Sequence, residues 1–173
     1  MIGLWIMKKE LKKIYVGKSK IHNKGIFAGS NIKKGEIVFI IKGKLVKFFV
    51  HNKKDALYGP NWVGISKNIW IDPNKPSKYL NHSCNPSCGI KGKVNVVALK
   101  DLKKGDEILI DYSIIEEEKL WYMNCNCGNK NCRGKVKSII HLPIKTYKKY
   151  LPYVPNYFKK VYDEYHGLKQ ENG

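Results

Sequence analysis

The sequence predicts a mainly β, α+β fold with short helices, built around one hydrophobic core. The chain has 173 residues, of which 43% are hydrophobic, enough for one domain with a small appendage. Its apolar runs are short, rich in branched or aromatic residues, and bounded by Gly, Pro, Asn or Asp, a pattern typical of strands. A helical period appears only after Gly134.

Two similar segments organise the first part of the chain. Residues 1–12 are predicted to be a lead-in, and residues 14–16 a first strand that ends at Gly17. Residues 28–37 and 98–108 each combine an Asn or Asp with Lys-Lys-Gly, a sequence typical of a tight turn between two strands. The strands that follow these turns are expected at residues 37–41 and 108–110.

Further apolar runs predict more strands at residues 45–50, 62–65, 69–71 and 94–99. Between Pro155 and Gly167, Phe158, Val161, Tyr162 and Tyr165 recur at helical spacing and predict a C-terminal amphipathic helix. Its aromatic stripe is expected to pack on the body of the protein; an independent binding role is the alternative.

The charge balance is strongly basic. Lys and Arg number 33 against 14 Asp and Glu, a net charge of +19, which favours contact with nucleic acid or nucleoprotein. A lysine-rich proteome is an equal explanation, because the lysines are scattered along the chain. No run approaches the roughly 20 apolar residues of a membrane span, so we expect a soluble, intracellular protein without membrane contact.

Five cysteines in such a protein indicate metal binding or catalysis more than disulfides. Cys125, Cys127 and Cys132 lie within eight positions in a Gly- and Asn-rich run, and closely spaced thiolates of this kind hold structural zinc. The fourth ligand remains open among the candidates Cys84, Cys88, His82 and His141. Buried free thiols or a redox pair are the alternatives.

Residues 79–88 hold a second polar cluster, which includes Asn81, His82 and Cys84. A cysteine nucleophile activated by His82 is disfavoured, because no orienting carboxylate or Gly-rich elbow accompanies the pair. An Asn-His pair by itself is more often structural than functional.

Three motifs, taken together, resemble the SET domain followed by its post-SET zinc motif. They are Asn-His-Ser-Cys-x-Pro from Asn81, Gly-Asp-Glu-Ile-Leu-Ile-Asp-Tyr ending at Tyr112, and Cys-x-Cys-x4-Cys-Arg-Gly from Cys125. Residues 24–28 and 70–72 are similar to the family's first cofactor-binding turn and to the strand end before the Asn-His pair. The resemblance implies a β-clip-like fold of small sheets around a knot-like active site.

The same resemblance implies a domain organisation. The SET domain spans residues 13–115, a zinc-bound post-SET flap spans residues 116–137, and a basic, aromatic, helical tail follows at residues 138–173. The pre-SET cysteine array that some members carry is missing from this sequence.

The resemblance also implies S-adenosyl-L-methionine as cofactor and structural Zn2+. The cofactor residues that it assigns are Lys24, Gly25, Ile26, Asn81, His82, Tyr112 and Trp121. The usual Gly-x-Gly of the first turn is Asn23-Lys24-Gly25 here, and Asn can replace Gly where φ is positive. Cys84 becomes the fourth zinc ligand beside Cys125, Cys127 and Cys132, and Cys88 is left over.

Tyr112 matches the family's catalytic tyrosine, which implies methyl transfer to a neutral lysine amine. Ile41, Ile110 and Tyr122 are expected to line the lysine channel. Ile41 and Ile110 stand where many members have aromatic residues, so the channel is expected to admit methylated amines and to give dimethyl- or trimethyl-lysine.

The expected partner is a protein that presents a lysine, such as a histone or another basic, nucleic-acid-associated protein. Action in the nucleus or at chromatin would fit a eukaryotic or viral source, and action in the cytoplasm or nucleoid a prokaryotic one. The alternative function is a non-catalytic, zinc-stabilised module that docks on nucleic acid or chromatin, for which Ile41 is the best support.

Overall fold

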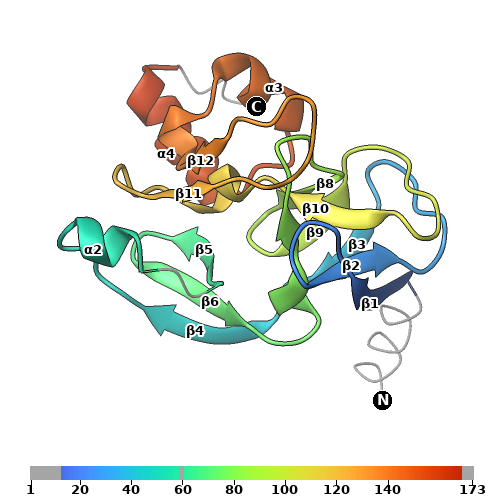
Figure 1. The fold of residues 1–173 in the computed structure, drawn as a ribbon. Helices are drawn as coiled ribbons and strands as arrows, with labels where there is room; N and C mark the ends of the chain where they lie inside the picture. The colour runs from blue at the N-terminus through green and yellow to red at the C-terminus, as the bar shows by residue number, and fades with distance from the viewer. Residues whose placement is uncertain (1–12, 59–60, 169–173) are drawn as a thin grey trace.

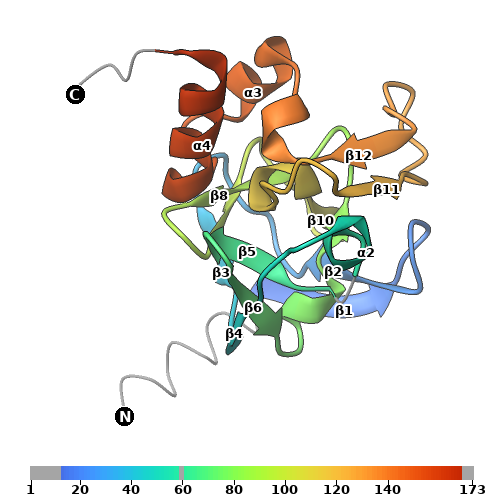
Figure 2. The ribbon, with the colours of Figure 1, turned by 90° about the vertical axis from the view of Figure 1, so that its left-hand side faces the viewer.

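The fold is mainly β, as predicted, with small sheets below and the C-terminal helices gathered above them (Figure 1, Figure 2). The computed structural model describes residues 13–58 and 61–168, so the expected lead-in at residues 1–12 lies outside the described part. Within that part, no helix is both long enough and apolar enough to cross a membrane.

The central sheet joins segments that are far apart in the sequence. Its order is β1-β2-β10-β7, with bounds Ile14–Lys18, Lys24–Ala28, Glu107–Ile110 and Asn81–His82. The first strand does not end at Gly17 as expected but continues to Lys18, paired with Lys24. Gly17 pairs with Gly25 inside the hairpin, and a Cβ there would lie only 3.2 Å from the Phe27 ring, so this glycine allows close packing and does not mark a strand end.

Two further sheets have three strands each. One has the order β3-β9-β8, at Ile37–Ile40, Asn95–Ala98 and Cys88–Lys91, and the other β4-β6-β5, at Gly43–Lys47, Ile69–Pro73 and Val63–Ser66. The predicted strand at residues 45–50 stops at Lys47, because its partner β6 begins at Ile69. Residues 48–50 therefore leave the sheet.

The two similar turn segments contact each other. Ile32 and Leu102 pair in an isolated antiparallel bridge at their centres. The backbone N–H of Lys34 donates to Asp101 Oδ1 at 2.9 Å, and the N–H of Lys104 donates to Asn31 Oδ1 at 3.0 Å. Each turn is thus capped by the polar side chain of the other, which the sequence similarity alone did not reveal.

Helices form the C-terminal layer. After the hairpin of β11 (Tyr122–Asn124) and β12 (Lys135–Lys137) come α3 (Ile144–Tyr150) and α4 (Asn156–His166). The predicted C-terminal helix is confirmed, and Gly167 ends it with a left-handed φ of 63°. Phe158 and Tyr162 are buried as expected, whereas Tyr165 remains 53% exposed.

Short helices complete the chain. They are α2 (Lys53–Ala56) and the 3-10 helices η1 (Ser77–Tyr79), η2 (Tyr112–Ile115) and η3 (Ile139–His141). The main core lies between the sheets and α4, and includes Ile26, Ile90, Ile108 and Phe158, each 2% exposed or less. This core fixes β7, β10 and η2, which bear the polar residues of the candidate site.

The turn geometry leads to a stability prediction. Gly35 and Gly105 have φ angles of +84° and +93°, which side chains with a Cβ adopt at a cost of about 1–2 kcal/mol. We expect Gly35→Ala and Gly105→Ala each to lower the free energy of unfolding by about that amount, measured by chemical denaturation. The exposed neighbour Lys104→Ala is the control, and an equal loss in it would contradict the backbone explanation.

Candidate functional site

Parallel pairing of β7 with β10 brings two distant motifs together. Asn81 lies opposite Leu109 and His82 opposite Ile110, and the N–H of Ser83 donates to the Ile110 carbonyl at 2.9 Å. The N–H of Tyr112 then donates to His82 Nδ1 at 3.1 Å. This meeting of two motifs, called the crossing below, lies where the family resemblance implied a knot-like active site, and His82 is at its centre.

His82 is a neutral acceptor at this crossing. Burial lowers the pKa of His82 to about 4, although the Asp111 carboxylate opposes the shift and Arg133 adds to it. Since Nδ1 accepts a hydrogen bond, the ring proton sits on Nε2, which faces Cys84 Sγ at 3.4 Å. The ring therefore links the Tyr112 backbone to the first cysteine.

The Tyr112 side chain is held at its hydroxyl. The hydroxyl donates to the Leu80 carbonyl at 2.6 Å, and its ring lies 5.4 Å from the His82 ring between centroids. Burial raises the pKa of Tyr112, so the hydroxyl stays protonated at neutral pH. Tyr112 is thus a positioned, uncharged hydroxyl at the edge of a cavity.

Asn81 connects the crossing to the first turn. Its Nδ2 donates to the Lys24 carbonyl at 3.0 Å and to Glu107 Oε1 at 2.9 Å. Asn23, at the start of this turn, has a φ of 38°, the positive value expected of an Asn in place of Gly. A Cβ at Gly25 would overlap the Glu107 carboxylate, so a larger residue there would displace the side chain to which Asn81 donates.

Four side chains with metal-binding atoms converge beside the crossing. The ligand atoms of His82, Cys84, Cys125 and Cys127 all lie within 4.8 Å of one another. Cys132 lies next to this group, where its thiol contacts those of Cys125 and Cys127 and accepts the Gly134 N–H at 3.4 Å. The structure therefore gathers three of the four predicted thiols with His82, and it places Cys132 outside the 4.8 Å group but in contact with two of its thiols.

The cysteine thiols differ in the direction in which their pKa is shifted. Burial raises the pKa of Cys84 and Cys125. Burial also acts to raise that of Cys127, but backbone hydrogen bonds from Cys84 and Asn129 and thiol hydrogen bonds from Cys125 and Cys132 outweigh it, giving about 6. Such a set of soft donors, one readily ionised, fits a zinc ion.

Cys88 and His141 lie outside this group. Cys88 begins β8 in the hydrophobic core, where burial raises its pKa to about 12. His141 is exposed and contacts Ser138 Oγ at 3.3 Å. The geometry thus separates these two from the candidates that spacing alone had left open.

An ion pair between Arg133 and Asp111 connects the cluster of cysteines to the crossing. Arg133 Nη2 donates to both oxygens of Asp111, at 2.6 and 2.7 Å, and the Arg133 N–H donates to Cys84 Sγ at 3.4 Å. The Tyr150 hydroxyl of α3 donates to Asp111 Oδ2 at 3.0 Å. Burial acts to lower the pKa of Arg133, but the Asp111 carboxylate raises it above its usual value.

Sequence reasoning treated Arg133 as a basic neighbour that favours thiolates, and it did not predict the contacts of Arg133 and Tyr150 with Asp111. Asp111 and Arg133 stand inside quoted motifs, directly before Tyr112 and after Cys132, and that position was the available signal. Nothing local to Tyr150 indicated a contact with residues almost forty positions away.

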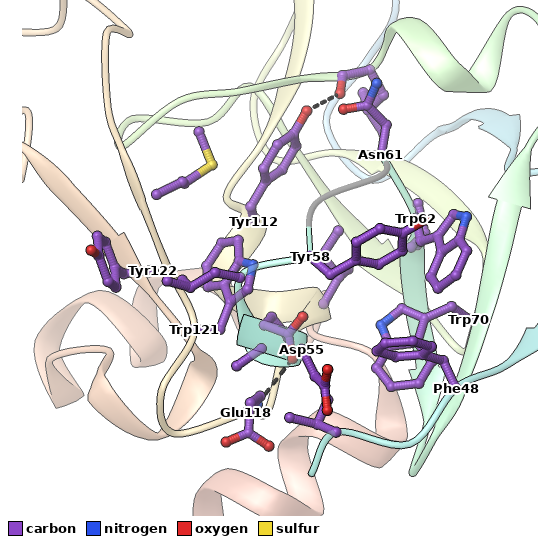
Figure 3. A pocket seen from close by; sticks show the side chains of 18 of the residues that line it. Phe48, Asp55, Tyr58, Asn61, Trp62, Trp70, Tyr112, Glu118, Trp121 and Tyr122 are labelled. Atoms are coloured by element: carbon purple, nitrogen blue, oxygen red, sulfur yellow. Dashed lines mark hydrogen bonds between the residues drawn. The ribbon is translucent and has the colours of Figure 1, made fainter. Parts of the chain in front are cut away.

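Beside Tyr112 lies a cavity of about 220 Å3 (Figure 3). Ile110, Tyr112, Trp121 and Tyr122 line it, as do several aromatic residues of the β4-β6-β5 sheet region. Glu116 also lines it, and burial raises the pKa of this carboxyl to about 7 against hydrogen bonds from the Glu118 and Glu117 N–H groups. Around Tyr112 the cavity is lined by the apolar side chains of Ile110 and Ile115, and apolar surroundings disfavour an ammonium ion relative to a neutral amine.

Two of the predicted site residues face elsewhere. Ile41, expected in the channel, is 2% exposed in the core, where its N–H pairs with Val94, and it is not among the residues lining this cavity. The Ile26 side chain is fully buried in the same core, so only its backbone is available for a cofactor.

Comparisons with known proteins agree with this geometry. A family model described as "SET domain" matches residues 23–113. The "Histone-lysine N-methyltransferase trithorax" of Drosophila virilis is 32% identical over 143 residues, covering 72% of this chain but 4% of the relative. The "Histone-lysine N-methyltransferase, H3 lysine-4 specific" of Schizosaccharomyces pombe is 30% identical over 144 residues, covering 74% of this chain and 15% of the relative.

Among solved structures, one similar fold is that of KRYPTONITE in complex with mCHH DNA, H3(1-15) peptide and SAH. It has a TM-score of 0.55 at 19% identity, covering 71% of this chain and 29% of that one. This likeness concerns the fold alone.

The ion pair gives a prediction about stability. Arg133→Met would leave Asp111 buried without its cation, which costs about 3–5 kcal/mol when one partner of a buried pair is removed. We expect a loss of that size in chemical denaturation, and a loss of about 1–2 kcal/mol for Tyr150→Phe. The exposed Lys130→Met is the control, and a loss below 1 kcal/mol in Arg133→Met would contradict this role of the pair.

Proposed function

Because the chain belongs to the SET-domain family, we propose that it is an S-adenosyl-L-methionine-dependent protein-lysine N-methyltransferase. The observation that carries the proposal is the pairing of the Asn81-His82 strand with the segment that ends in Asp111-Tyr112, at the edge of a cavity. The chain spans only 4% to 15% of the relatives described above, so their activity supports the proposal without settling it.

The proposed cofactor residues form one continuous edge. Asn81 holds the Lys24 carbonyl, and His82 holds the Tyr112 backbone, so the first turn and the crossing present their polar groups together. Peptide carbonyls and a small turn of this kind suit the amino-acid and adenine ends of S-adenosyl-L-methionine. When bound, this cofactor supplies an electrophilic methyl group. Trp121 lies in the Tyr112 cavity and would bound the site from the flap side.

Tyr112 and the cavity prepare the lysine amine. A free lysine has a pKa of about 10.4, so its amine is mostly protonated near pH 7. Ile110 and Ile115, which line the cavity close to Tyr112 in the chain, disfavour the ammonium form, and the amine proton leaves to solvent before attack. The Tyr112 hydroxyl, fixed on the Leu80 carbonyl, then orients the neutral amine toward the methyl group.

The cluster of cysteines would hold one zinc ion. We assign Cys84, Cys125, Cys127 and Cys132 as ligands, and His82 as the partner that donates its Nε2–H to the Cys84 sulfur. Zinc, when bound, supplies a tetrahedral cross-link between the crossing and the β11-β12 hairpin. Because Tyr122 lies on β11 and lines the cavity, this cross-link fixes one wall of the substrate channel.

The substrate would be a lysine of a basic protein, with a histone as the first candidate because the relatives are named for that activity. We further propose that the protein acts at chromatin or another nucleoprotein, consistent with its net charge of +19. Ile41, which motivated the non-catalytic alternative, is a core residue and gives that alternative no support in the structure.

The zinc assignment has a direct test. The purified protein should contain about one zinc ion per chain, measured by inductively coupled plasma mass spectrometry, because four thiolates complete a tetrahedral site. Cys84→Ser and Cys132→Ser should lose most of it, and Cys88→Ser, a buried cysteine outside the group, should keep it. Full zinc in Cys132→Ser with loss in His82→Gln would instead make His82 the fourth ligand.

The catalytic assignment is tested by Tyr112→Phe, which removes only the hydroxyl bound to Leu80. We expect transfer of radiolabelled methyl groups to histones to fall by about 100-fold or more, with zinc content and cofactor affinity little changed. Tyr147→Phe, which loses a hydroxyl bond to Asp163 away from the site, is the control. Normal turnover in Tyr112→Phe would mean that Tyr112 is a packing residue.

A further inference from the structure

Opposite Trp121 and Tyr122, the cavity is bounded by an aromatic wall made of Phe48, Tyr58, Trp62 and Trp70 (Figure 3). Phe48 meets Trp62 and Trp70 edge to face, with centroids 5.7 and 6.2 Å apart. Tyr58 meets Trp62 edge to face at 6.1 Å and is itself 62% exposed. The rings therefore form a half-open wall, and not a closed core.

Carboxylates stand beside this aromatic wall. Asp55, Glu116 and Glu118 line the same cavity, and we call them the acidic rim. Asp55 accepts hydrogen bonds from the His51 N–H and the Asn52 amide, and Glu118 accepts one from the Leu120 N–H, while Lys78 also lines the cavity. Three carboxyl groups and one lysine among the lining residues reverse the balance of 33 basic and 14 acidic residues in the whole chain.

The rim continues past the cavity. An adjoining hollow of about 460 Å3 shares Trp70, Glu116 and Glu118 with it. A ligand that extends from Tyr112 along this side of the protein would meet Glu116, Glu117 and Glu118 there, and also Lys67 and Lys119. Closer to Tyr112, the ring faces and the carboxylates both carry negative potential and attract cations.

We propose that the aromatic wall and the acidic rim bind a second basic side chain of the protein substrate, a lysine or arginine close in sequence to the target lysine. The proposal rests on the proposed function, because the target lysine occupies the Tyr112 side of the same cavity. The occupant follows from charge complementarity: a basic side chain offers both the aliphatic stem that packs on the rings and the cation that pairs with the rim. The protein would thus select basic sequences instead of isolated lysines.

Synthetic peptides test this selection. Each would carry one central lysine and, at each neighbouring position in turn, a second lysine or the uncharged, similarly shaped norleucine. Binding is measured by calorimetry with S-adenosylhomocysteine present, and methyl transfer by steady-state kinetics. We expect at least one position where lysine binds about fivefold or more tightly than norleucine and lowers KM with little change in kcat.

Neutral variants locate the effect. The double variant Asp55→Asn, Glu118→Gln keeps side-chain shape and the local backbone hydrogen bonds. In it, the ratio of the affinity for the lysine peptide to that for the norleucine peptide should fall to about one. Glu164→Gln, an exposed carboxylate on α4, is the matched control and should keep the full ratio. Thermal unfolding of each variant verifies that the fold is unchanged.

The outcomes separate the two proposals. Equal binding of lysine and norleucine peptides at every position, or an unchanged ratio in the double variant, would overturn the second cation site even if methyl transfer is normal. A lysine preference that depends on the rim, without methyl transfer to any peptide, would support the site and contradict the proposed catalytic function.

Discussion

The buried pair of Asp111 and Arg133 is the interaction on which the rest of the site depends. Asp111 is fully buried, and an isolated carboxylate in that position would be costly without the guanidinium beside it. Because Arg133 follows the last cysteine and Asp111 precedes Tyr112, the pair ties the thiol loop to the crossing. The Tyr150 hydroxyl adds the C-terminal helices to the same carboxylate. One charge thus sets the relative positions of three parts of the chain.

This arrangement explains why the thiols and the cavity lie on either side of one short segment. His82 faces Cys84 with one nitrogen and the Tyr112 backbone with the other, while the Tyr112 hydroxyl reaches the Leu80 carbonyl. A shift of the cysteine loop would therefore move His82 and, through it, Tyr112. The flap side of the cavity follows the same loop, because β11 and β12 flank the cysteines. The proposed metal site and the proposed substrate cavity therefore share this backbone.

Local signals in the sequence predicted most strands, both turns and the C-terminal helix, because Gly, Asn and apolar periodicity act over a few residues. The helices α2 and α3, with four and seven residues, are too short to show a period. The family resemblance implied that Cys84 lies beside the later cysteines, but other contacts across the fold were out of reach. Tyr150 meets Asp111 only because α3 packs there, and Ile41 is buried in the core. The aromatic wall likewise draws on three segments that the sequence keeps apart.

The reciprocal capping of the two turns bears on how fast the protein can fold. Asp101 caps a residue 67 positions away and Asn31 one 73 positions away. Neither cap can form until the chain between the two turns has closed a long loop. The conformational entropy of that loop is lost before any of these contacts compensates for the loss. The central sheet, whose β2 and β10 are brought together by the same closure, must wait for it as well. Folding of this small domain is therefore governed by non-local contacts, and it is expected to be slow for its size.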